Sequence, residues 1–206
     1  MGIMATEGGK QRKLIPQGMH DAVNFMVVDI GTQFNPAFGT SSRKVLLGWE
    51  FPDHRIKTDD SDRPMVSSKT FTLSLHEKAT LRKTLESWRG SKFTQEQLAK
   101  GFDISKLLGV NCQIQILHEE KNGKVYDNIA NILPPKSGKI AVVNTENEHL
   151  YYSMDDNMEI PANLYDWVVK RIKESEEYSN VQEEPDGPEG PDFDDYSDDG
   201  DNSIPF

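Results

Sequence analysis

Aromatic and cationic side chains interleave along residues 34–126 of the chain. Flat aromatic faces can stack on nucleic-acid bases, and Lys and Arg side chains can neutralise phosphates, so the two together suit an unpaired strand of nucleic acid. The candidate aromatic residues are Phe34, Phe38, Trp49 and Tyr126, with the amide of Asn128 beside Tyr126. The candidate cations are Arg43, Lys44, Arg55, Lys57, Lys69, Arg89, Lys92, Lys121 and Lys124.

The aromatic positions differ in how well their local pattern suits a binding surface. Tyr126 and Asn128 share one face of an alternating segment, and that face is polar and aromatic together, which favours stacking. Trp49 follows the apolar face of its own segment, so it fits a core as well as it fits a site. Phe34 and Phe38 lie in a segment rich in Gly, Pro and Asn, where exposed aromatic residues suit binding.

Charge is divided unevenly along the chain. Residues 174–206 carry 13 acidic side chains and no Lys or Arg, whereas residues 1–173 carry 21 acidic side chains and all 23 basic ones. The overall net charge of −11 therefore hides a mildly basic body joined to a strongly acidic tail. This asymmetry predicts nucleic-acid binding by the body and an interaction role for the tail.

Signatures of catalysis and of bound cofactors are missing from the sequence. It has no Gly-rich phosphate loop, no G-x-S-x-G and no H-E-x-x-H, and its five histidines lack metal-ligand spacing. Cys112 is the single cysteine, which excludes a disulfide framework. No apolar run is long enough to cross a bilayer. We therefore expect a binding protein without enzymatic activity, cofactor, metal or membrane contact.

Hydrophobic periodicity predicts the elements that position these residues. A two-residue period predicts three strands and then two more, and a helical period predicts an insert between them. Segments 31–42 and 52–68 have the composition of loops. The expected strands cover residues 20–30, 43–51, 69–75, 111–120 and 124–133, and the expected helical segments cover residues 76–90, 94–102 and 103–109. This order predicts a mainly β chain, a five-stranded OB-fold barrel with a helical insert between strands 3 and 4.

Composition divides the chain into four parts. We expect a disordered leader over residues 1–16 and an OB-fold domain that binds a single strand of nucleic acid over residues 17–135. Residues 136–175 should form an irregular extension and an amphipathic helix over 160–175, with Leu164, Trp167, Val168 and Ile172 on one face. Residues 176–206 should form a disordered acidic tail that contacts other proteins.

The chain ends in DFDDYSDDGDNSIPF, in which acidic residues surround isolated aromatics before an apolar tripeptide. This end resembles the C-terminal tip of bacterial and phage single-stranded DNA-binding proteins, which docks replication, recombination and repair enzymes. The resemblance implies that Phe206 enters an apolar pocket on a partner, where its carboxylate meets a basic side chain. It also implies that Ile204 and Pro205 pack nearby, and that Asp198, Asp199 and Asp201 steer toward a positive surface. Asn202 and Ser203 depart from the usual tip, where aspartates are more frequent.

A second resemblance covers roughly residues 14–135. The segments IPQGMHDAVNFMVVDIGTQF, LESWRG, FDISKLLG and VYDNIANILP are similar to those of phage-encoded single-stranded DNA-binding proteins with an OB-fold. The resemblance implies a protein that coats and protects single-stranded DNA in phage replication, recombination or repair. It places the chain in the cytoplasm of an infected bacterium, associated with the nucleoid, and allows self-association along the DNA.

Two other functions fit parts of the same pattern. An adaptor could bind one protein through the body and another through the tail, and an OB-fold could bind RNA in place of DNA. The interleaved aromatics and cations favour a nucleic-acid ligand over the adaptor, and the Ile-Pro-Phe end favours DNA over RNA.

Overall fold

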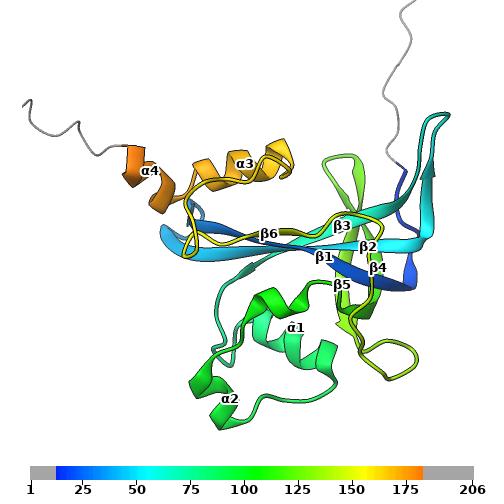
Figure 1. The fold of residues 1–206 in the computed structure, drawn as a ribbon, viewed down its shortest axis with the longest axis horizontal. Helices are drawn as coiled ribbons and strands as arrows, with labels where there is room; N and C mark the ends of the chain where they lie inside the picture. The colour runs from blue at the N-terminus through cyan, green and yellow to red at the C-terminus, as the bar shows by residue number, and fades with distance from the viewer. Residues whose placement is uncertain (1–12, 183–206) are drawn as a thin grey trace, which may run out of the picture.

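The computed structural model describes residues 13–182, and its chain is mainly β, as predicted (Figure 1). A helical insert separates the third and fourth strands, and two further helices follow the sixth strand. The strands are β1 (Gly18–Asn35), β2 (Thr40–Lys57), β3 (Asp62–Thr72), β4 (Asn111–Lys121), β5 (Lys124–Leu133) and β6 (Leu150–Tyr152). The helices are α1 (Thr80–Arg89), α2 (Gln95–Lys100), the 3-10 helix η1 (Ile104–Leu107), α3 (Asp166–Lys173) and α4 (Glu176–Gln182).

The five long strands form one antiparallel sheet in the order β3-β2-β1-β4-β5, and the short β6 pairs with β1 in parallel. β1 is the central strand, and it is buried without interruption from residue 22 to residue 31. Such a run arises because both faces of β1 are covered: one face packs on an inner core and the other on an outer core.

The inner core lies between the sheet and α1. Alternate residues of β2 point into it, and α1 presents an apolar stripe that includes Trp88. The ring of Trp49 lies 5.9 Å from that of Trp88, and none of the Trp49 side chain is exposed. Trp49 is therefore a core residue, and its prediction as a base-stacking residue is wrong. The two-residue period of its own strand explains the outcome, since that period also buries Val45 and Leu47.

The outer core covers the opposite face of β1 and β2. β6 and α3 contribute Leu150, Tyr152, Val168 and Ile172, which pack on Phe25, Val28, Ile30 and Leu46 of the sheet. In Figure 1, α3 and α4 lie on one side of the long β1–β2 hairpin, and α1 and α2 lie on the other. The amphipathic helix expected over residues 160–175 thus packs on its own sheet, but it begins only at Asp166.

The sheet of the described residues is open between its two edge strands. β3 and β5 approach each other at one point, where the Lys69 ammonium donates a hydrogen bond of 2.7 Å to the Ile129 carbonyl oxygen. No backbone ladder joins the two edges within residues 13–182. We call the gap between β3 and β5 the seam.

Two segments expected as loops are mostly strand. β1 and β2 continue through polar residues, which pair across the hairpin as Thr32 with Arg43 and Phe34 with Ser41, and only a short turn ending near Gly39 separates them. β3 begins at Asp62 and includes Pro64, which an edge strand tolerates because it needs only one row of backbone partners. The polar composition of these segments reflects strands that extend beyond the two cores into solvent.

The boundaries expected for the leader and the tail also differ from the structure. Ile15 is fully buried, and its N–H donates to the Asp127 carboxylate at 3.0 Å, so the ordered body starts before residue 17. α4 forms where the tail was expected to begin, because the Ser175 hydroxyl accepts a hydrogen bond from the Tyr178 N–H and caps the helix. The rest of the expected leader, residues 1–12, and the rest of the tail, residues 183–206, lie outside the described residues.

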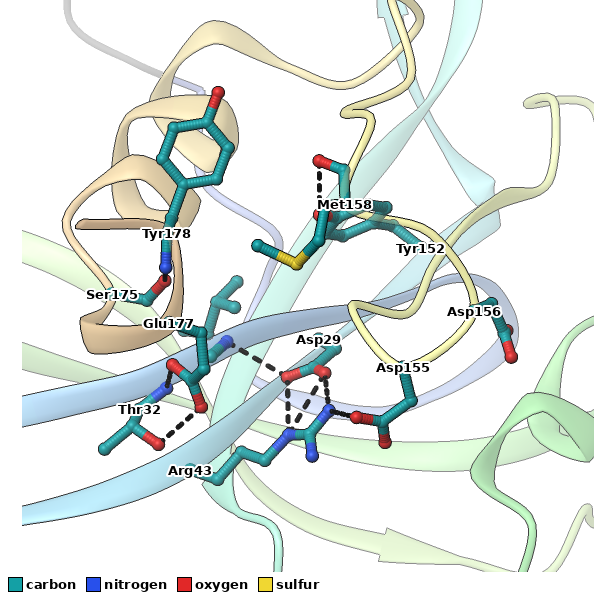
Figure 2. A network of polar contacts seen from close by, with 12 residues as sticks. Asp29, Thr32, Arg43, Tyr152, Asp155, Asp156, Met158, Ser175, Glu177 and Tyr178 are labelled. Atoms are coloured by element: carbon teal, nitrogen blue, oxygen red, sulfur yellow. Dashed lines mark hydrogen bonds and ion pairs between the residues drawn. The ribbon is translucent and has the colours of Figure 1, made fainter. Parts of the chain in front are cut away.

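A set of polar contacts, which we call the clasp, fastens the C-terminal extension to the β1–β2 hairpin (Figure 2). The Arg43 guanidinium binds the carboxylates of Asp29 and Asp155, and the Glu177 carboxylate accepts hydrogen bonds of 2.7 Å from both the N–H and the hydroxyl of Thr32. Beside them Gly31 has a φ of 68°, and a Cβ at this position would lie only 2.5 Å from the Ser175 Cβ. The close approach of α4 therefore requires glycine there.

Glu177→Gln should lower the free energy of unfolding by about 1 kcal/mol, because it weakens two hydrogen bonds to a charged group that water partly screens. Burial alone would raise the pKa of Glu177, but the hydrogen bonds from Thr32 outweigh it and the pKa lies below its ordinary value. A depressed pKa means that this stabilisation is present above the ordinary Glu range and is lost as the pH falls through the folded-state value.

Denaturant titrations between pH 3 and pH 7 check this expectation. The difference between Glu177→Gln and the unaltered chain should be largest at pH 7 and should shrink on acidification. Glu174→Gln removes the same charge at an exposed position, where the nearest cation, Lys170, lies 3.9 Å away, and it is the matched control. Equal effects of the two substitutions at pH 7 would contradict the role of the clasp.

Candidate nucleic-acid interface

A cleft of about 460 Å³ opens along the seam, and we call it the seam cleft. β5 forms one wall, β3 the opposite wall, and the C-terminal extension closes a third side. Its lining residues are Tyr126, Asp127 and Asn128 of β5, Arg63, Pro64, Val66, Ser67 and Ser68 of β3, Asn147, Tyr165 and Trp167 of the extension, and Phe25, Met26 and Ile56. The cleft thus joins segments that are about 100 residues apart in the sequence.

Three aromatic side chains of the seam cleft are partly exposed: Tyr126 by 42%, Tyr165 by 39% and Trp167 by 46%. Large aromatic side chains of soluble proteins are usually mostly buried, so three exposed ones in one cleft mark a surface suited to a flat ligand. Tyr126, which the sequence predicts as a stacking residue, lies exposed on β5 beside Asn128.

Trp167 does not join the apolar face expected for its helix. Val168 and Ile172, four residues apart, are fully buried against the sheet, and Leu164 is buried just before the helix begins. Residue 167 is rotated by about 100° from residue 168, which turns its side chain away from the outer core. The assignment of Trp167 to the buried face is therefore wrong, and the structure places it in the seam cleft instead.

Arg63 on β3 is the cation among the residues that line the cleft, and Lys69 lies beside it in the seam. Burial raises the pKa of the Tyr165 phenol, and the positive charge of the exposed Arg63 nearby partly offsets this rise. Lys69 is half-buried, and burial lowers the pKa of its ammonium, although the negative charge of Glu119 acts to raise it. Because the Lys69 ammonium already binds the Ile129 carbonyl oxygen, it holds the seam together, whereas the Arg63 guanidinium is exposed.

Two carboxylates limit how a polyanion could lie here: Asp127, which lines the cleft and accepts a hydrogen bond from the Ile15 N–H, and Glu119. Glu119 of β4 pairs directly with Tyr126 across the strands, and it accepts a hydrogen bond from the Asn128 amide. Asn128 therefore lines the cleft with its amide engaged by Glu119. A bound phosphate would avoid Glu119, so the favourable side for the backbone of a nucleic acid is the β3 wall that carries Arg63.

Three further predicted cations lie at strand ends near the seam cleft. Lys121 and Lys124 face each other at the β4–β5 turn, two positions beyond the pair formed by Glu119 and Tyr126, and both are exposed. Lys57 is exposed at the end of β2, where its ammonium forms an ion pair of 3.4 Å with the Asp62 carboxylate. The strand ends near the seam cleft therefore carry cations on both the β3 and the β5 sides.

The other predicted cations lie elsewhere or are already paired. Arg43 belongs to the clasp, where the hydrogen bond to Asp29 raises its pKa above the ordinary value. Arg55 is bound to Glu146 and Asp62. Lys44 donates to the Thr72 hydroxyl, Arg89 lies over the Phe93 ring, and Lys92 follows the same helix. The structure does not bring Arg43, Lys44, Arg89 and Lys92 to the seam cleft.

Phe34 and Phe38 are exposed by 62% and 78%, in accord with their prediction as accessible aromatic residues. They lie at the tip of the β1–β2 hairpin, whereas β4 pairs with the other end of β1, through residues 18–23. In Figure 1 the hairpin tip and the β4–β5 turn lie in different parts of the molecule. Phe34 and Phe38 are therefore not part of the aromatic group in the seam cleft.

Sequence reasoning missed Tyr165 and Trp167 as site residues. Tyr165 directly precedes α3, and Trp167 lies in its first turn. The clear apolar stripe of this helix suggested that the side chain of Trp167 is buried. The useful signal was the position of Trp167 directly before Val168, because two adjacent helical residues cannot both point to the centre of one buried stripe.

Among residues 13–182, no cluster of three or more His, Cys, Asp or Glu side chains could hold a metal ion. In the same range, no helix combines the length and the apolar composition needed to span a bilayer. No protein-family model matches the chain, and no curated protein matches it.

Proposed function

We propose that this chain binds single-stranded DNA in the seam cleft and acts like the phage-type single-stranded DNA-binding proteins that its sequence resembles. One observation carries the proposal: Tyr126, Tyr165 and Trp167 expose aromatic faces in one cleft whose β3 wall carries Arg63. Aromatic stacking with a cation at the edge is the combination by which proteins hold unpaired bases, and it tolerates any sequence.

The strand order supports an OB-fold as the framework of this function. An OB-fold is a five-stranded, partly open Greek-key barrel, and strand 3 would approach strand 5 to complete it. Here β3 and β5 are the two edges of the sheet, and Lys69 links them across the seam. The helical insert lies between β3 and β4, where the sequence predicts it.

A duplex suits this cleft less well than a single strand does. Stacking on Tyr126 or Trp167 needs a free base face, which a base inside a duplex does not offer. We therefore expect the protein to coat and protect single-stranded DNA by binding alone, without catalysis.

Partner recruitment is the proposed role of the acidic tail. The tip residues Asp198, Asp199, Asp201, Ile204, Pro205 and Phe206 all lie outside the described residues, so their role depends on the resemblance stated above. α4 and the clasp fix the point at which the tail leaves the body, on the α3 side of the sheet. The proposed partners are replication and recombination enzymes with a basic, apolar pocket.

Fluorescence-anisotropy titrations with labelled single-stranded DNA, duplex DNA and RNA test the proposal. We expect the tightest binding to single-stranded DNA, with little dependence on base sequence. The logarithm of the affinity should fall with the logarithm of salt by roughly 0.7 for each phosphate neutralised. Tighter binding to RNA would favour an RNA-binding function, and no binding to any nucleic acid at low salt would favour the adaptor and refute the proposal.

A further inference from the structure

The segment before β1 crosses one end of the seam cleft. This segment covers residues 13–16, and we call it the strap. The Ile15 N–H donates a hydrogen bond of 3.0 Å to the Asp127 carboxylate on β5, and the Lys13 ammonium donates one of 2.8 Å to the Arg55 carbonyl oxygen on β2. The strap therefore runs from the β5 wall of the cleft to the side formed by β2 and β3.

Further contacts fix the strap to the body. Ile15 is fully buried in the inner core. Its carbonyl oxygen accepts a hydrogen bond of 2.7 Å from Nε2 of His118, and the Pro16 carbonyl oxygen accepts one of 2.8 Å from Nε2 of His20. Because the strap is held at consecutive residues, the position of Lys13 relative to the cleft is fixed as well.

Lys13 lies at the end of the cleft that carries Arg63. Arg55, whose carbonyl oxygen binds the Lys13 ammonium, pairs with Pro64 across β2 and β3. Pro64 and Arg63 both line the cleft. In Figure 1 the blue start of the described chain lies at the same end of the molecule as the β2–β3 hairpin. Lys13 thus adds a positive charge on the side that already favours the phosphates of a bound strand.

Neighbouring carboxylates do not cancel this charge. Those of Asp62 and Glu146 lie near the same end, and the Arg55 guanidinium binds both. Lys57 also lies 3.4 Å from Asp62, so two cations balance these two carboxylates. The Lys13 ammonium binds a neutral carbonyl oxygen, and this contact leaves its charge available to a phosphate.

The sequence extends the cation of the strap into a cluster. Residues 10–13 are Lys-Gln-Arg-Lys, and residues 10–16 include no Asp or Glu. At about 3.3 Å per residue, the backbone of residues 10–12 lies within roughly 10 Å of Lys13. This distance is close to one Debye length at physiological salt, so Lys10 and Arg12 act electrostatically at the same end of the cleft.

We propose that Lys10, Arg12 and Lys13 form a phosphate-binding arm, which the strap fixes at the Arg63 end of the seam cleft. The arm contacts the phosphates of a single strand whose bases stack on the aromatic residues of the cleft. It supplies positive charge to a cleft that has one cation among its lining residues. The inference rests on the proposed function and adds contacts to the nucleic-acid backbone outside the cleft itself.

Salt titrations of DNA affinity with the full chain test the arm. The variant Lys10→Gln/Arg12→Gln/Lys13→Gln removes its three charges and leaves the buried Ile15 in place. We expect it to bind labelled oligothymidylate at least about tenfold more weakly at low salt. The slope of the logarithm of affinity against the logarithm of salt should become shallower by roughly 1.4–2.1, at about 0.7 for each of two or three phosphate contacts.

Two further variants separate local charge from other effects. Lys78→Gln/Lys83→Gln/Lys100→Gln removes the same charge at exposed positions between β3 and β4, and its slope should match that of the unaltered chain. Lys10→Arg/Lys13→Arg keeps the charge of the arm and should also retain the original slope. A structural role of the lysines, in contrast, would weaken binding without a change in slope.

Crosslinking locates the arm on the ligand. With Gln11 replaced by the photoreactive residue p-benzoylphenylalanine, irradiation should join the chain to bound oligothymidylate. The same replacement at Gln95, an exposed position of α2, should give no crosslink. If the unaltered chain binds DNA, an arm variant with an unchanged slope, or no crosslink from residue 11, would overturn the inference alone. Failure of the unaltered chain to bind any nucleic acid would refute the proposed function and the arm together.

Discussion

The double variant Tyr126→Ala/Trp167→Ala binds single-stranded DNA at least about 30-fold more weakly than the unaltered chain, if the seam cleft is the binding site. Each stacked base contributes about 1–3 kcal/mol, so the loss of two stacking faces costs about 2 kcal/mol or more. Both side chains are nearly half exposed, and neither belongs to the inner or the outer core. The substitutions should therefore leave the free energy of unfolding almost unchanged.

Anisotropy titrations at one fixed salt concentration measure this loss, and Phe38→Ala is the matched control. Phe38 is more exposed than either cleft residue and was also a stacking candidate from the sequence, yet it lies at the hairpin tip. Its removal should change the affinity less than twofold. A large loss in Phe38→Ala with little loss in the double variant would place the interface at the hairpin tip instead.

Trp49→Ala should lower the free energy of unfolding by about 3–5 kcal/mol, which is the usual cost of removing a large buried aromatic side chain. The side chain is completely buried against Trp88, so truncation leaves a cavity in the centre of the inner core. Trp49→Phe keeps part of the volume and should cost less. Chemical denaturation of each variant, monitored by far-ultraviolet circular dichroism, provides the measurement.

DNA affinity separates the two roles considered for Trp49. If Trp49 is only a core residue, the folded Trp49→Phe variant should bind single-stranded DNA within about twofold of the unaltered chain, because no face of the ring reaches solvent. A stable Trp49→Phe protein with a 10-fold weaker affinity would show that Trp49 contacts the ligand, and the assignment to the core would have to be withdrawn.

The two-residue period of each strand indicates that the Tyr126 side chain is exposed and that the Trp49 side chain is buried, and both hold in the structure. The prediction for Trp49 was wrong because it gave the neighbouring basic residues more weight than the period. Tyr126 lies on a strand face that alternates with Asp127 and Ile129, and both of these alternating residues are buried. Trp49 follows the same two-residue rule on β2 and is buried, as Val45 and Leu47 are. Its nearness in sequence to basic residues suggested a site, but sequence proximity does not determine which layer covers a side chain.

The third wall of the seam cleft could not be predicted, because it depends on packing between distant segments. Tyr165 and Trp167 reach the cleft only because β6 and α3 cover the outer face of β1, more than 100 residues earlier in the chain. The expectation that 31–42 was a loop failed for a related reason. Its polar residues form strand because they pair across the hairpin and meet the clasp, and neither contact leaves a local signature.

One face of β1 packs on the inner core and the other face packs on the outer core, so the two cores share the same sheet. The C-terminal extension is therefore not an accessory that can be detached. A chain truncated before Leu150 would expose Phe25, Val28 and Ile30 to solvent. These apolar side chains lie on β1, the central strand of the sheet. The body should unfold as a single cooperative unit. Truncated fragments should aggregate through the exposed apolar face of β1 and should not form a smaller folded domain.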